Sequence, residues 1–187
     1  WYGTPHMGVR SAEAYIGRLI AKGYKVAICE QVEDPKLAKG MVKREVTRVV
    51  TPGTTLNAQA LDETKNNYIM CIAYIGDHYG ISSADITTGD YYVTEVDSER
   101  KLLDEVNKYQ PTEIICNEAF YISGIDIDDM KNRMGIVIYS LDAWYFSDET
   151  AQMTLKDHFK VRDLEGLGLA DYDSGVVAAG ALLKYLY

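Results

Sequence analysis

Hydrophobic positions near the start of the chain follow first a helical and then a strand pattern. In residues 11–22 apolar side chains recur every three or four positions, which predicts a helix with Ser11 as its N-cap and Gly23 at its C-terminal end. Residues 25–31 then form a short apolar run that ends in the acidic turn at residues 33–35. We therefore predict a buried strand packed against this helix.

A second strand is predicted just downstream, where valines alternate with basic side chains. Val42, Val46 and Val50 lie among these charges, and we expect a half-buried basic strand with the valines inward. Proline, glycine and threonine in residues 51–55 favour a turn that closes the strand. The cations that lie close together here are Lys36, Lys39, Lys43, Arg44 and Arg48.

Beyond residue 67 the pattern changes to three closely spaced strands followed by alternating helices and strands. Residues 68–75, 80–85 and 90–96 are rich in Ile, Tyr, Val and Thr and are separated by turns, which predicts an antiparallel meander. The later predicted elements are a helix from Asp97 or Ser98 to Tyr109, a strand at 113–116, a loop with one or two helical turns at 119–133, a strand at 135–139 and a helix at 147–159. This order predicts an α/β fold that resembles an RNase H-like mixed sheet.

The last two predicted helices differ in how they expose apolar side chains. In residues 147–159, Ala151, Leu155 and Phe159 form one stripe, which we expect to pack on the sheet, while Met153 points outward. The helix at residues 173–187 is apolar nearly all round. Such a helix is normally buried on more than one face, so we expect one of its packing partners to be missing from the chain.

Net charge divides the chain into a basic and an acidic part. Residues 1–52 carry nine Lys or Arg against five Asp or Glu, a charge of +4, whereas residues 53–187 carry ten against twenty-three, a charge of −13. An acidic domain is repelled by the phosphate backbone, while a basic segment contributes to non-specific DNA affinity. We expect only the first part to lie near DNA, although ordinary solvated surface explains both charge sets equally well.

Composition indicates a cytoplasmic protein with one or two cores. Hydrophobic residues make up 47% of the chain, but no run approaches the roughly 20 apolar residues that span a bilayer. Cys29, Cys71 and Cys116 are odd in number and lack C-x-x-C spacing, so we expect buried thiols in a reducing compartment. Residues 1–7 lack a signal-peptide pattern, and we interpret residues 1–10 as sequence foreign to the natural chain.

Four motifs carry a resemblance to a known family. AICEQVEDP, KREVTRVVTPGT, DITTGDYY and RDLEGLG occur in the order of consecutive landmarks of MutS, the bacterial DNA mismatch-recognition family, and the resemblance covers roughly Ser11 to Tyr187. It implies that the chain is a fragment. The implied parts are the C-terminal part of the mismatch-binding domain at 1–52, a linker at 53–66, an RNase H-like connector domain at 67–162, and a hinge with the first helix leading to the core domain at 163–187.

The resemblance implies a non-catalytic role for this fragment. In the family the connector relays between mismatched-DNA binding, the ATPase region and MutL. The full-length protein is a homodimer that uses ATP and magnesium, but no G-x-x-x-x-G-K-[ST] loop occurs here. The family's mismatch-stacking Phe-x-Glu motif is expected upstream, since neither Phe120, Phe146 nor Phe159 is followed two positions later by Glu.

The resemblance also implies two binding sites. The five cations named above are expected to contact the DNA backbone weakly and without sequence preference. Gln152, Met153 and Lys156, on or beside the outer face of the helix at 147–159, are expected to contact MutL. The alternative interpretation of Met153 is a lone exposed methionine, which is common and needs no explanation.

A metal-dependent RNase H-like nuclease is the alternative enzyme class, and a generic interaction module is a third possibility. A two-metal nuclease needs a carboxylate on the first strand, but residues 68–75 contain none. We expect Asp85, Asp90 and Glu95 to be solvated or capping residues at strand ends. His6, His78 and His158 are isolated in the sequence, and we therefore predict no metal site and no catalytic residues.

Overall fold

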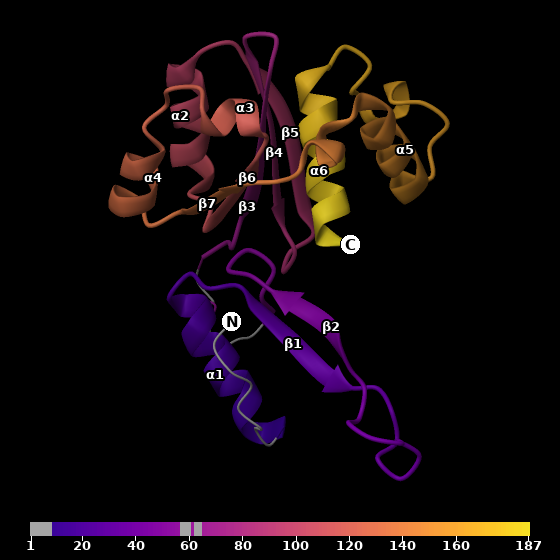
Figure 1. The fold of residues 1–187 in the computed structure, drawn as a ribbon. Helices are drawn as coiled ribbons and strands as arrows, with labels where there is room; N and C mark the ends of the chain where they lie inside the picture. The colour runs from indigo at the N-terminus through magenta and orange to yellow at the C-terminus, as the bar shows by residue number, and fades with distance from the viewer. Residues whose placement is uncertain (1–8, 57–60, 62–64) are drawn as a thin grey trace. The chain divides into compact units, whose positions relative to one another are not determined.

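The computed structural model describes residues 9–56, 61 and 65–187, with side chains described from residue 12 onward. The chain divides into two compact units, Trp1–Lys65 (unit 1) and Asn66–Tyr187 (unit 2), and each is treated by itself (Figure 1). Most of residues 1–10, interpreted above as foreign sequence, and most of the polar segment before residue 66 lie outside the described residues.

In its described residues, unit 1 contains one helix and a two-stranded antiparallel sheet. The helix α1 spans Val9–Ala21, and β1 (Val26–Gln31) pairs with β2 (Arg44–Val50). Because α1 begins upstream of Ser11, the prediction of Ser11 as N-cap is wrong: Val9 and Arg10 carry no helix-stopping signal, and the helix includes them. Gly23 does follow the helix end with φ of +80°, a conformation that glycine adopts without strain.

The core of unit 1 is small because α1 covers only one face of the hairpin. Ile16 and Ile20 of α1 pack with Val50, and Val26 and Ile28 flank them. The predictions of a buried first strand and a half-buried second strand are wrong, since Val50 is the only fully buried residue of either strand. Val46, for example, is 55% exposed. One covering helix leaves the opposite face of a two-stranded sheet in water.

Unit 2 is built on a five-stranded mixed sheet. Its strands are β3 (Ile69–Ile75), β4 (His78–Asp85), β5 (Asp90–Val96), β6 (Glu113–Cys116) and β7 (Val137–Ser140). Their order is β5-β4-β3-β6-β7, with an antiparallel meander from β3 to β5 and parallel pairing of β6 to β3 and β7. The predicted meander and the RNase H-like α/β class are confirmed.

Helices cover both faces of this sheet. They are α2 (Glu99–Tyr109), α3 (Glu118–Tyr121), α4 (Ile127–Arg133), α5 (Asp148–Phe159) and α6 (Ser174–Leu186), with 3-10 turns η1 (Ala143–Phe146) and η2 (Glu165–Leu167). In Figure 1, α2, α3 and α4 lie on one face, α6 lies on the other, and α5 lies beyond α6. Ser98 caps α2 and Ser147 caps α5, as the sequence predicts.

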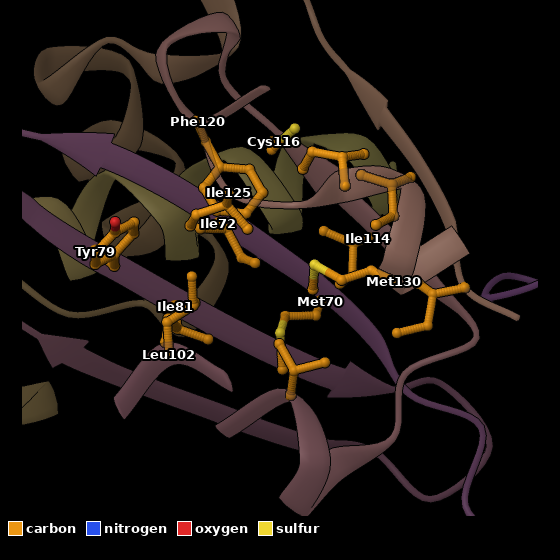
Figure 2. Close-up of a cluster of buried hydrophobic side chains, with 14 residues drawn as sticks. Met70, Ile72, Tyr79, Ile81, Leu102, Ile114, Cys116, Phe120, Ile125 and Met130 are labelled. Carbon is orange, nitrogen blue, oxygen red and sulfur yellow. The ribbon is translucent and has the colours of Figure 1, made fainter. Parts of the chain in front are cut away.

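The central strand β3 is buried on both faces, which explains its continuous apolar sequence. Met70 and Ile72 contribute to the cluster under α2, α3 and α4, which is drawn in Figure 2. Cys71, on the alternate face, packs under α6, whereas Cys116 lies in the first cluster. Burial raises the pKa of both thiols, that of Cys116 to about 12. Cys29 is exposed, so its prediction as a buried thiol is wrong.

Helix α6 is the second central element of unit 2. Its residues Val177, Ala178, Ala181 and Leu182 pack on the sheet, while its other side packs against Ala151 and Leu155 of α5. The expectation that α6 lacks a packing partner is therefore wrong, whereas its role as the helix that leads to a core domain stays a prediction. α5 supplies that partner, and consequently α5 packs on α6, not on the sheet as its stripe of Ala151 and Leu155 suggested.

Two glycines permit these close approaches. A Cβ atom at Gly80 of β4 would lie 1.9 Å from the carbonyl oxygen of Ser174, so the start of α6 rests directly on the strand backbone. A Cβ atom at Gly180 of α6 would lie 2.3 Å from Cα of Ala151 in α5. Real Cβ atoms do not approach other atoms so closely, and both contacts therefore require glycine.

Candidate DNA-contact and partner-contact sites

The five predicted DNA-contact cations all lie on or beside the hairpin of unit 1. Lys36 and Lys39 lie in the connection between β1 and β2, Lys43 directly precedes β2, and Arg44 and Arg48 lie within it. The base of this connection is ordered, since the Val32 N–H donates to the Lys43 carbonyl (3.1 Å) and the Lys43 N–H donates to the Glu33 carboxylate (3.0 Å). The hairpin therefore holds all five side chains in one exposed region of unit 1.

The strand register nevertheless divides the cations between two faces. Arg48 pairs with Ile28 and so lies on the face that α1 covers, whereas Arg44 pairs with Gln31 on the opposite face. A register shift between Ile28 and Cys29 leaves Thr47 with no residue of β1 opposite it. At that point the alternation of β2 side chains between the two faces of the hairpin is reversed. A bulge of this kind leaves no mark in the sequence pattern.

Two of the five cations have carboxylate partners. The Lys43 ammonium lies 2.5 Å from Glu45, and the Arg48 guanidinium lies 3.4 Å from Glu13 of α1, all on exposed side chains. Lys36, Lys39 and Arg44 form no ion pair with any described carboxylate. These three are therefore the cations best able to contact phosphate, and an exposed pair such as Lys43 with Glu45 is easily exchanged for another partner.

The predicted partner-contact residues are held on a fixed helix. Ala151 and Leu155 are buried against α6, and the Ser147 hydroxyl accepts from the Thr150 N–H at the start of α5. Met153 is 59% exposed, as predicted. Gln152 is half-buried and donates to the Asp148 carboxylate at 2.8 Å. The outer face of α5 thus offers a flexible thioether in water on a helix whose inner face is buried against α6.

Next to this face lies a groove of about 690 Å³, formed by α5, the segment around η2 and the start of α6. Gln152 and Lys156 line the groove, whereas Met153 does not. Four carboxylates share the lining, and Lys156 forms no ion pair with any described residue. The predicted contact residues are therefore divided between the exposed outer face of α5 and the adjacent acidic groove.

The carboxylates that a nuclease would need serve structural roles. Asp85 accepts from the Asn67 N–H at 2.9 Å and from the Thr87 N–H and hydroxyl at 2.8 and 2.6 Å. Burial raises the pKa of Asp85, but these hydrogen bonds outweigh it and leave the pKa below its ordinary value. Asp90 accepts from the Thr88 hydroxyl at 2.8 Å. Both residues stabilise the turn between β4 and β5.

Glu95 has a capping role, as expected, but the helix that it caps lies far along the chain. Its carboxylate accepts from the backbone N–H groups of Asp173 at 2.6 Å and Gly175 at 2.8 Å, so a residue of β5 caps the start of α6. Glu95 lies five positions beyond Asp90 on the same strand, roughly 16 Å away at the rise of an extended chain. Only the strand order that brings β5 beneath α6 could have indicated this cap.

No grouping of metal-ligating side chains occurs in the described part of the chain. In residues 9–56, 61 and 65–187, no three His, Cys, Asp or Glu side chains are placed so that together they could hold a metal ion. His78 contacts the Gly76 carbonyl and His158 contacts the Tyr187 hydroxyl, while His6 lies outside the described residues. At the carboxyl end of β6, beside β3, stands Asn117, whose amide is bonded to Tyr74. This geometry gives no support to a two-metal nuclease.

Glu113 is a fully buried charged side chain of the core sheet, as is Asp85. It lies on β6 and accepts from the Tyr185 hydroxyl at 2.8 Å, and Tyr185 in turn is hydrogen-bonded to Tyr139. These contacts connect the end of α6 to the sheet.

Among the described helices, none is both long and apolar enough to cross a bilayer.

Comparison with known proteins agrees with this architecture. The family model described as MutS domain II matches residues 67–187, and that described as MutS domain I matches residues 3–59. The DNA mismatch repair protein MutS of Lachnoclostridium phytofermentans is 63% identical over 186 residues, and that of Ruminiclostridium cellulolyticum is 46% identical over 188 residues. Each alignment covers 98% of this chain but only 20% and 21% of the relative, so the chain spans about a fifth of their length. Since the domain II match alone covers well over half of its residues, the chain belongs to the MutS family of DNA mismatch repair proteins.

Proposed function

We propose that this chain is a non-catalytic part of a mismatch repair protein, in which unit 1 contributes to DNA-backbone binding and unit 2 is a connector that binds MutL. The names of its relatives support a place in DNA mismatch repair. In this proposal unit 2 relays between mismatched-DNA binding, the ATPase region and MutL. ATP, magnesium and the homodimer interface belong to the rest of the full-length protein.

The MutL proposal rests on the difference between the two sides of α5, one packed closely against α6 and the other exposed to water. Gly180 of α6 brings the two helices so close that Ala151 is fully buried, and this fixes the orientation of α5. Met153 then projects into water. A methionine adapts its shape to a partner at low cost, while a rigid helix keeps the loss of conformational entropy on binding small.

A double substitution on this face tests the proposal. Met153→Asp with Gln152→Ala should weaken MutL binding about tenfold or more. The reason is that a negative charge would replace the apolar methionine side chain at the centre of the proposed contact with MutL. Titration of the parent chain and the variant with MutL measures the effect. The thermal midpoint should stay unchanged, since Ala151 and Leu155 remain in place. Equal affinities at an unchanged midpoint would mean that this face is scaffold only.

The DNA proposal rests on the three cations that have no described carboxylate partner, Lys36, Lys39 and Arg44. Exposed lysine and arginine side chains can neutralise phosphates, and phosphate contacts carry no sequence information. We therefore expect weak binding with equal affinity for matched and mismatched duplexes and with steep salt dependence. A clear preference for the mismatched duplex in a titration would contradict this part of the proposal.

A further inference from the structure

The acidic groove beside α5 combines an apolar floor with a strongly one-sided charge. Phe146, Leu164, Val176 and Val177 contribute apolar surface. Phe146 belongs to η1, Leu164 directly precedes η2, and the two valines belong to α6. The carboxylates around them are Asp148, Asp163, Glu165 and Asp173. The single cation in the lining is Lys156, so the formal charge of the groove is −3.

The four carboxylates of the groove, called the rim carboxylates below, remain available to a ligand. Their local hydrogen bonds use only part of their capacity to accept hydrogen bonds. Asp163 accepts one bond, from the Gly166 N–H at 3.2 Å. Asp148 accepts from Gln152 within the same helix at 2.8 Å. No described lysine or arginine forms an ion pair with Asp148, Asp163, Glu165 or Asp173. The negative charge of these four carboxylates is thus not neutralised by an ion pair.

We propose that this groove receives a basic segment of the protein partner, an arginine or lysine flanked by apolar side chains. The cation would lie between the rim carboxylates, with the apolar neighbours on Leu164, Val176 and Val177. A volume of about 690 Å³ falls within the range of roughly 300–1,000 Å³ that encloses a compact ligand. Charge complementarity selects the basic segment, since an acidic one would meet unpaired like charges.

The same chemistry rejects nucleic acid as the occupant. A phosphate placed in the groove would face four carboxylates and one ammonium group. The groove adjoins Gln152, which lies beside Met153 on α5, so one partner can cover both surfaces. The inference therefore rests on the proposed function for the identity of that partner, MutL, but not for the charge that the groove selects.

Two pairs of substitutions, each of which removes two carboxylate charges, compare the groove with the rest of the acidic surface. Asp163→Asn with Glu165→Gln removes two rim charges, whereas Asp104→Asn with Glu118→Gln removes two exposed charges on α2 and α3, on the opposite face of the sheet from the groove. At low salt the first pair should weaken MutL binding about three- to tenfold and reduce its salt dependence, because rim charges act through steering and direct pairing. The control pair should bind as the parent does.

A second arm uses a probe that does not depend on MutL. A short blocked peptide with arginine between two leucines is titrated into the 187-residue chain and followed by the amide shifts of residues 146–177. The same peptide with citrulline in place of arginine is the neutral control. The arginine peptide should shift amides around Leu164 and Val176, and the citrulline peptide should not.

The two arms distinguish the failure of the groove from the failure of the proposed function. If the parent does not bind MutL but the arginine peptide shifts the groove amides, the proposed function fails and the groove stands. If MutL binds the parent and both variant pairs equally, or if the two peptides behave alike, the groove proposal is overturned.

Discussion

The two units differ in how many sides of their sheets are covered. In unit 2 the sheet carries α2, α3 and α4 on one face and α6 on the other, and β3 is buried along most of its length. Among the described residues of unit 1, one helix covers one face of two strands, and the buried cluster consists of Ile16, Ile20 and Val50. Unit 2 therefore supplies a rigid framework, whereas unit 1 supplies an exposed basic hairpin.

This difference matches the chemistry that each unit presents. A surface that selects a protein partner needs fixed side chains, because each side chain ordered on binding costs about 0.5–1.5 kcal/mol. Contacts to phosphate are long-range and tolerate a less constrained surface. The acidic charge of the second part of the chain and the basic charge of the first separate the two proposed functions further.

The largest effect is expected at the contact between α5 and α6. Gly180→Ala should lower the free energy of unfolding of unit 2 by about 2–3 kcal/mol, because the new Cβ atom would lie 2.3 Å from Cα of Ala151. Helix propensity alone predicts the opposite sign, a gain of about 1 kcal/mol. Denaturant unfolding distinguishes the two outcomes, and a stabilised variant would show that the helices can separate freely.

Gly166→Ala is the matched control for that substitution. The nearest atom to a Cβ at Gly166 is Cγ1 of Val161 at 3.9 Å, an ordinary contact. We expect a change within about 0.5 kcal/mol. If both alanine variants lost the same stability, the close approach of α5 and α6 would not be the cause.

A smaller effect is expected at the cap of α6. Glu95→Ala should destabilise unit 2 by about 1–2 kcal/mol, because the N–H groups of Asp173 and Gly175 lose their acceptor. Glu95→Gln keeps one acceptor oxygen and should lose less. Thermal unfolding of the two variants beside Asp104→Ala, an exposed position of α2, gives the comparison. Equal losses for alanine and glutamine would argue against the cap.

The smallest effect is expected in unit 1, where the two faces of the hairpin can be compared directly. Val50→Ala should cost about 1 kcal/mol, because Val50 packs on Ile16 and Ile20. Val46→Ala should change stability by less than about 0.5 kcal/mol, because Val46 is 55% exposed. Hydrogen exchange of the β1 amides reports the local stability. Similar losses at both positions would mean that the outer face is covered in solution.

Most of unit 2 could be predicted from the sequence because its local signals agree with its packing. The turns at residues 76–78 and 87–90 delimit the meander, and Ser98 and Ser147 begin their helices as predicted. Unit 1 was predicted less well. An apolar run at residues 26–29 indicates a strand, but whether another layer covers that strand depends on tertiary contacts that no local pattern contains.

The candidate sites show the same limit. Periodicity correctly placed Met153 outside and Ala151 inside, but it could not tell that α6, not the sheet, lies beneath α5. The groove combines residues from β3, η1, α5, η2 and α6, so sequence spacing gives no sign of it. The capping role of Glu95 likewise depends on a contact across 78 and 80 positions.

The central claim is that DNA contact belongs to unit 1 and partner contact to unit 2. Photo-crosslinking from two positions of the 187-residue chain tests it most directly, with a photoreactive residue in place of Lys39 or of Met153 and with duplex DNA and MutL both present. We predict DNA adducts from position 39 that disappear at high salt, and MutL adducts from position 153 that persist. MutL adducts mainly from position 39, or DNA adducts mainly from position 153, would contradict the account.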